Sequence, residues 1–182
     1  MAFAIVLCTA ITACGQPAQV ILLRHAEKPA DSDAVHLSSR GQQRARALVS
    51  LLGRLSPLTS NAPVAALYAT RVTQRDHGQR TGETLEPLAK DLGLPILKPF
   101  GSDEYSRLAA SVLGNPAYHG KTVIICWTHH DLAAFAGALG VLPLPPAWRD
   151  NTFDRLWRII FTADPTQFID LSQHLLPGDS TR

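Results

Sequence analysis

The sequence has little charge and little cysteine for its length. Only 18% of its 182 residues are charged, and 17 Lys and Arg against 15 Asp and Glu leave a net charge of +2. This near balance argues against a dedicated nucleic-acid binder, which needs a strongly basic face. The three cysteines, Cys8, Cys14 and Cys126, are too few and too irregularly spaced for a zinc site or a disulfide framework.

The most apolar stretch of the sequence is too short to cross a membrane. Residues 1–13 carry no charge, but a membrane-spanning helix needs roughly 20 apolar residues. The length matches the apolar core of a secretory signal peptide, and residues 11–15, Ile-Thr-Ala-Cys-Gly, resemble the lipobox of bacterial lipoproteins. The resemblance implies a signal peptide at 1–13, lipidation of Cys14 and a place in the cell envelope. The alternative is an N-terminal strand or helix packed into the core.

The remainder, residues 14–182, reads as one α/β domain. At 46% hydrophobic residues, the chain can bury a full core. Continuous apolar runs predict strands at 19–23, 64–69, 96–97 and 122–127. Segments of helical period predict helices from Ser38 or Ser39 to about 52, and at 80–92, 103–113 and 131–139. Residues 153–161 and 166–171 predict a terminal hairpin or a pair of edge strands. This alternation is typical of a layered fold with a mostly parallel sheet.

Four motifs occur in order along this domain. In Leu23-Arg24-His25-Ala26-Glu27, Arg24 and His25 directly follow the first strand, at the end where open α/β sheets bind ligands. The others are 37–45 (LSSRGQQRA), 68–70 with 80–89 (YAT, RTGETLEPLA), and 123–131 (VIICWTHHD), which precedes a helix closing in Leu139-Gly140. Together they resemble the signatures of the histidine phosphatase superfamily, the phosphoglycerate-mutase-like proteins. The resemblance implies a three-layer α/β/α sandwich.

The resemblance also implies roles for individual residues. His25 would be the nucleophile, Arg24 and Arg80 would bind phosphate, and His129 would be the second catalytic histidine and a further phosphate ligand. The long segment 71–79 leaves Arg71 and Arg75 as alternatives to Arg80. The doubled histidine leaves His129 or His130 for the second role, and strand alternation would direct only one of them into the site.

These residue types suit phosphoryl transfer. A histidine nucleophile attacks through a neutral imidazole nitrogen, and positive donors stabilise the charge that develops on the phosphoryl oxygens. A planar guanidinium grips a phosphate in two places. The N-terminus of the helix near Asp131 would point its N–H groups at the same crevice. No metal or cofactor is expected, because the sequence has no carboxylate cluster and no paired-histidine helix motif.

The proton donor for the leaving group is the open question of the sequence. Glu104 lies where one branch of the superfamily has its acid, and Asp103 is next to it. Asp131 follows the histidine pair, as the acid does in the acid-phosphatase branch. A phosphohistidine phosphatase can omit the donor, because imidazole leaves more readily than an alkoxide.

The preferred prediction is a metal-independent phosphatase that hydrolyses a phosphomonoester or phosphohistidine through a phosphohistidine at His25. Its partner would be a small phosphorylated substrate or a phosphoprotein, with no nucleic acid, and with membrane contact only through the lipid anchor. A phosphoglycerate-type mutase is less favoured, because the chain lacks room for substrate-enclosing segments. A non-catalytic phosphate-binding module tethered to the envelope is the alternative from another class.

Overall fold

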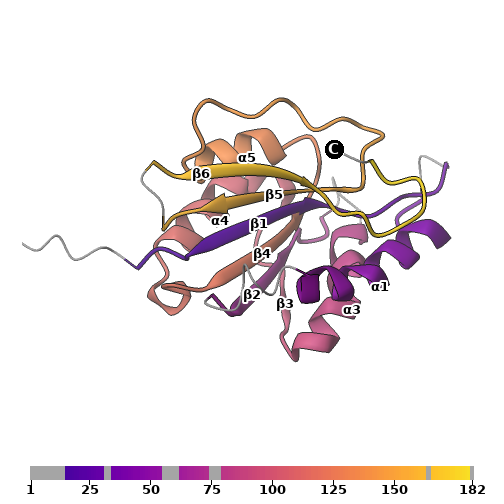
Figure 1. The fold of residues 1–182 in the computed structure, drawn as a ribbon, viewed down its shortest axis with the longest axis horizontal. Coiled ribbons are helices and arrows are strands. Elements are labelled where there is room, and N and C mark those ends of the chain that lie inside the picture. Colours follow the sequence, from indigo (N-terminus) through magenta and orange to yellow (C-terminus); the bar gives the residue numbers. More distant parts are fainter. Residues whose placement is uncertain (1–14, 31–33, 55–61, 74–78, 163–164, 181–182) are drawn as a thin grey trace, which may run out of the picture.

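A six-stranded sheet forms the centre of the protein, in the order β3-β2-β4-β1-β5-β6 (Figure 1). The structure is a computed structural model that describes residues 15–30, 34–54, 62–73, 79–162 and 165–180. The strands β1 (Gln19–Arg24), β2 (Val64–Ala69), β3 (Ile96–Leu97) and β4 (Thr122–Trp127) run parallel. The pair β5 (Arg155–Ile160) and β6 (Gln167–Ser172) continues the sheet antiparallel beyond β1. The predicted mostly parallel sheet with a terminal hairpin is confirmed.

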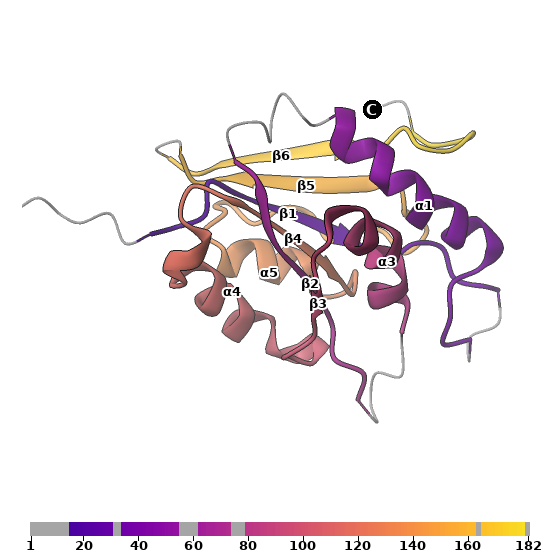
Figure 2. The same ribbon diagram turned by 90° about the horizontal axis from the view of Figure 1, so that it is seen from below.

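Helices cover both faces of this sheet. On one side α1 (Ser39–Arg54) lies against α3 (Arg80–Leu92), and on the other α4 (Tyr105–Leu113) lies against α5 (Leu132–Ala138) (Figure 2). Alternate residues of β1 enter the two cores: Val20 and Leu22 pack on the side of α4 and α5, and Ile21 on the side of α1 and α3. Burial on both faces explains why the strands are continuous apolar runs. The three-layer α/β/α architecture is therefore confirmed.

The helix boundaries follow the sequence with one informative difference. Helix α3 spans the predicted residues and ends at Gly93, whose φ of 65° is left-handed. The helix predicted from residue 103 instead begins with a 3-10 turn, Ser102–Glu104, before α4. The Glu104 carboxylate accepts the Gly101 backbone N–H at 2.8 Å, so this side chain caps the tight turn. The capping contact sets the start of the helix, and apolar periodicity does not reveal it.

The predicted signal peptide, residues 1–13, and the predicted lipid site at Cys14 lie outside the described residues. Within the described segments, no helix combines the length and the apolar character that crossing a bilayer requires.

Candidate active site

A cavity of about 290 Å³ opens where β1, β4 and α3 bring their loops together. Arg24 and His25 enter it from the end of β1, and Arg80 from the start of α3. Residues that follow β4 complete this wall. The lining consists of Arg24, His25, Lys28, Thr70, Arg80, Thr81, Ser102, Thr128, His129, His130 and Asp131. The structure thus brings polar residues of three of the four motifs into one place, whereas none of residues 37–45 lines the cavity.

Arg24 is held rigidly by the loop of residues 149–153. Its side chain is buried, with the residue 2% exposed. Nη1 donates to the backbone carbonyls of Arg149 (3.1 Å), Asp150 (2.7 Å) and Thr152 (3.1 Å). The guanidinium carbon lies 4.0 Å from the centre of the Phe153 ring. Burial lowers the pKa of Arg24 to about 10, so it remains a cation at neutral pH.

His25 is held as a neutral imidazole. Its Nδ1 lies 2.7 Å from the Ala26 carbonyl oxygen. Because a carbonyl oxygen can only accept, Nδ1 carries the proton and Nε2 keeps its lone pair. Burial, together with the positive charges of Arg24 and Arg80, lowers the pKa of His25 to about 3, against the opposing hydrogen bond to Ala26. The next residue is fixed in turn, because Ala26 N–H donates to the Thr84 hydroxyl of α3 at 2.9 Å.

Two buried guanidinium N–H groups are left for a ligand. Arg80 is tethered by Nη1 to the Ala34 carbonyl, as Arg24 is tethered to the 149–153 loop. Over the described residues, the Nε atoms of Arg24 and Arg80 are buried and have no hydrogen-bond partner. Both arginines line the cavity, and a buried cationic donor without a partner is costly unless an anion satisfies it. The pair therefore suits a tetrahedral oxyanion.

The other arginines considered from the sequence lie elsewhere. Arg71 is exposed, and its guanidinium donates to the Pro99 carbonyl (3.0 Å) and to the Glu104 carboxylate (2.9 Å). It does not line the cavity. Arg75 lies outside the described residues. Of the two arginines that can be compared, the geometry favours Arg80 for the phosphate role.

Both histidines after β4 line the cavity, whereas strand alternation predicts only one. The prediction is wrong because β4 ends at Trp127 and residues 128–131 form a turn. The His129 and His130 rings lie 3.8 Å apart, centre to centre. Arg24 Nη2 donates to His129 Nδ1 at 3.2 Å, and Nε2–H of His129 donates to Asp150 at 3.1 Å. Burial and the neighbouring Arg24 and His130 lower the pKa of His129 to about 4, and Asp150 opposes this.

The acids proposed from the sequence are placed very differently. Glu104 binds Arg71 and Arg107 and caps Gly101, contacts that lower its pKa. It does not line the cavity, and neither does Asp103. Asp131 does line it, and its carboxylate accepts the Thr128 hydroxyl at 2.6 Å.

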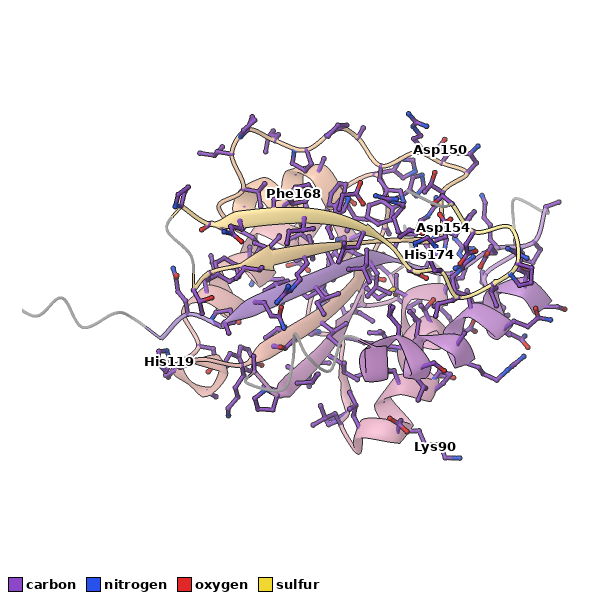
Figure 3. All side chains as sticks on the ribbon, viewed as in Figure 1. Lys90, His119, Asp150, Asp154, Phe168 and His174 are labelled. Atoms are coloured by element: carbon purple, nitrogen blue, oxygen red, sulfur yellow. The ribbon has the colours of Figure 1, made fainter. Side chains whose placement is uncertain are left out.

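The 149–153 loop is the part of the site that the sequence analysis missed. Figure 3 shows Asp150 on the irregular segment between α5 and β5, with His119 at the opposite end of the sheet. The loop contacts Arg24 through backbone carbonyls, which every residue type has, so these contacts leave no signal in the sequence. The signals present in the sequence were aromatic: Trp148, which is buried and donates to the Thr152 carbonyl at 2.8 Å, and Phe153.

One group in the described part of the chain, His129 with His130 and Asp150, has potential metal ligands within 4.8 Å of one another. A histidine that binds a metal through Nε2 normally carries its proton on Nδ1 and donates it to an acceptor. Here Nδ1 of His129 faces a donor, the Arg24 guanidinium. The charge of Arg24 repels a cation, and Nε2 of His129 carries a proton because Nδ1 accepts from Arg24. These residues therefore do not fit a metal site.

No protein-family model and no curated protein sequence matches the chain. Several solved structures do. The protein histidine phosphatase SixA, complexed with tungstate, is 16% identical, with a TM-score of 0.55, covering 85% of this chain and 97% of that one. A phosphoglycerate mutase from Plasmodium falciparum is 14% identical (TM-score 0.55, 90% and 96%). The mycobacterial glucosyl-3-phosphoglycerate phosphatase, complexed with VO3, is 13% identical (TM-score 0.56, 85% and 98%). The chain therefore has the phosphoglycerate-mutase-like histidine phosphatase fold.

Proposed function

We propose that this protein is a metal-independent phosphatase that forms a phosphohistidine at His25. The observation that carries the proposal is a neutral His25, with its lone pair on Nε2, beside two arginines that line the same cavity and whose buried Nε–H groups have no partner among the described residues. His25 is the nucleophile, and the two guanidinium groups bind the oxygens on which charge accumulates during phosphoryl transfer.

The reaction has two steps. Nε2 of His25 attacks phosphorus, the new N–P bond forms, and the bond to the leaving oxygen breaks with its electron pair, so that this oxygen takes up a proton. Water then attacks the phosphohistidine, loses a proton and releases phosphate, and Nε2 recovers its lone pair. Arg24 and Arg80 hold the phosphoryl oxygens in both steps, and the 149–153 loop keeps Arg24 in place.

The substrate class is a phosphomonoester or a phosphohistidine, on a small molecule or a protein. The solved structures of similar fold include a protein histidine phosphatase and a sugar phosphoglycerate phosphatase, which supports this range. The similar phosphoglycerate mutase makes the acceptor of the phosphoryl group a necessary measurement. With labelled substrate, we expect the phosphoryl group to appear as inorganic phosphate and not on a second substrate hydroxyl.

The nucleophile is tested by trapping the intermediate. Acid-labile, alkali-stable phosphate should be found on the wild-type protein after brief reaction with 4-nitrophenyl phosphate, and His25→Ala should abolish both this label and hydrolysis. The fold of the variant is checked by circular dichroism. A His25→Ala protein that is folded and still hydrolyses the ester would overturn the assignment. If the wild type binds phosphate but hydrolyses neither an ester nor a phosphohistidine, the protein is a binding module.

We also propose that the protein is anchored in the cell envelope through a lipid on Cys14, after removal of residues 1–13. The support is the uncharged apolar run that ends at this cysteine. Cys14→Ser should prevent incorporation of labelled fatty acid and release the protein from the membrane fraction. Recovery of an intact Met1 from that fraction contradicts the proposal.

A further inference from the structure

We propose that His130 is the catalytic acid that protonates the leaving oxygen, an inference that rests on the proposed phosphatase function. An alkoxide is a poor leaving group, and a positioned general acid typically accelerates its departure by about 10² to 10⁴-fold. The acid must line the cavity, and its proton must not already be donated to another group of the protein. These two requirements can be applied to each titratable residue around the site.

The carboxylates fail one requirement or the other. Glu104 does not line the cavity, and Arg71 and Arg107 both pair with it, which keeps it ionised. Asp103 is exposed and does not line the cavity either. Asp131 lines the cavity, but its Oδ2 already accepts the Thr128 hydroxyl.

The ring nitrogens of the other two histidines of the cavity are already used, in hydrogen bonds or in the attack on phosphorus. His25 uses Nδ1–H on the Ala26 carbonyl and needs Nε2 for attack. His129 accepts from Arg24 at Nδ1 and donates to Asp150 from Nε2. Lys28 lines the cavity too, but an ammonium group is a weak acid near neutral pH.

His130 meets both requirements. It lines the cavity, it is exposed, and in the described residues neither of its ring nitrogens has a hydrogen-bond partner. Its ring lies against the ring of His129, which limits the orientations of His130. A carboxylate oxygen of Asp150 lies within 4.8 Å of a ring nitrogen of His130.

The proton cycle then balances. Imidazolium His130 gives its proton to the leaving oxygen as the P–O bond breaks, and becomes neutral. In the second step the neutral ring accepts a proton from the water that attacks the phosphohistidine, and the imidazolium is restored. One histidine thus serves as acid and then as base.

The test compares leaving groups. We expect wild type to hydrolyse 4-nitrophenyl phosphate, phenyl phosphate and the alkyl ester glycerol 2-phosphate. In His130→Gln, kcat/KM for glycerol 2-phosphate should fall by about 100-fold or more, while that for 4-nitrophenyl phosphate, whose leaving group needs no proton, should change by less than about threefold. The matched control His119→Gln, on an exposed histidine beyond the opposite end of β4, should leave both substrates unaffected.

Three results would overturn the inference. An equal loss on both substrates would place His130 in phosphate binding, no loss on either would give it no role, and a wild type that cleaves aryl but not alkyl esters would show that the site has no acid. His130→Asp supplies a second variant, which should recover alkyl-ester hydrolysis at acidic pH. The absence of any phosphohistidine in the wild type is a separate outcome, because it rejects the proposed function itself.

Discussion

Arg44 and Asp179 join α1 to the C-terminal segment through a two-point ion pair. Nη1 and Nη2 of Arg44 lie 2.9 and 2.7 Å from the two carboxylate oxygens, and both side chains are 3% exposed. The same guanidinium donates to Glu27, two residues after His25. Helix α1, the C-terminal segment and the loop that follows His25 therefore meet at one buried charge, that of Arg44.

Asp179→Ala should destabilise the protein by about 3 kcal/mol, because it leaves the Arg44 guanidinium buried with half of its counter-charge. The measurement is the free energy of unfolding in urea. The control is Asp170→Ala, which removes a carboxylate that is 44% exposed and pairs with Arg155; it should cost less than about 1 kcal/mol. Equal costs would contradict the role given to the buried pair.

The same pair predicts a loss of stability in acid. Burial alone would raise the pKa of Asp179, but hydrogen bonds from Arg44 and from two backbone N–H groups lower it to about 2. An unfolded aspartate binds its proton near pH 4, so stability falls as the pH drops from about 4 to about 2. The contribution lost is about 2 kcal/mol. Asp179→Ala should lack this part of the pH dependence when urea unfolding is followed over the same range.

Gly41 allows α1 to pack directly on the loop that follows His25. A Cβ at this position would lie 2.2 Å from the Glu27 carbonyl oxygen, closer than any contact allows. Gly41→Ala should therefore lower the free energy of unfolding by about 2 kcal/mol, despite the better helix propensity of alanine, and should reduce phosphatase activity by moving Glu27. Gln43→Ala, on an exposed position of the same helix, should do neither.

The fold and much of the site could be predicted because their signals lie in residue identity. The continuous apolar run at β1 marks a strand buried on both faces, with Arg24 at its last position and His25 directly after it. The 149–153 loop could not be predicted, because backbone carbonyls hold Arg24. The surroundings of Glu104 could not be predicted either, because only the folded chain shows that two arginines form ion pairs with its carboxylate.

Arg80 and Arg71 offer a paired test of the phosphate site. Arg80→Ala removes a buried donor from the cavity and should lower kcat/KM for 4-nitrophenyl phosphate by about 100-fold, as expected for one transition-state donor. It should also weaken inhibition by tungstate. Arg71→Ala removes an exposed contact to Glu104 and should change either value by less than about threefold. The reverse order would move the phosphate role to Arg71.

The neutral state of His25 predicts a pH dependence of folding. Its pKa is lowered from 6.5 to about 3, chiefly by burial, so below pH 6.5 the unfolded chain binds a proton that the folded protein refuses. The free energy of unfolding must then decrease with falling pH, by about 2 kcal/mol between pH 7 and pH 5. His25→Gln removes this contribution, so the decrease between the two pH values should be smaller than in wild type by that amount. His119→Gln, on an exposed histidine, should keep the wild-type decrease. A wild-type decrease in His25→Gln would mean that the pKa of His25 is the same in the folded and unfolded chain, and would contradict the neutral state given to it here.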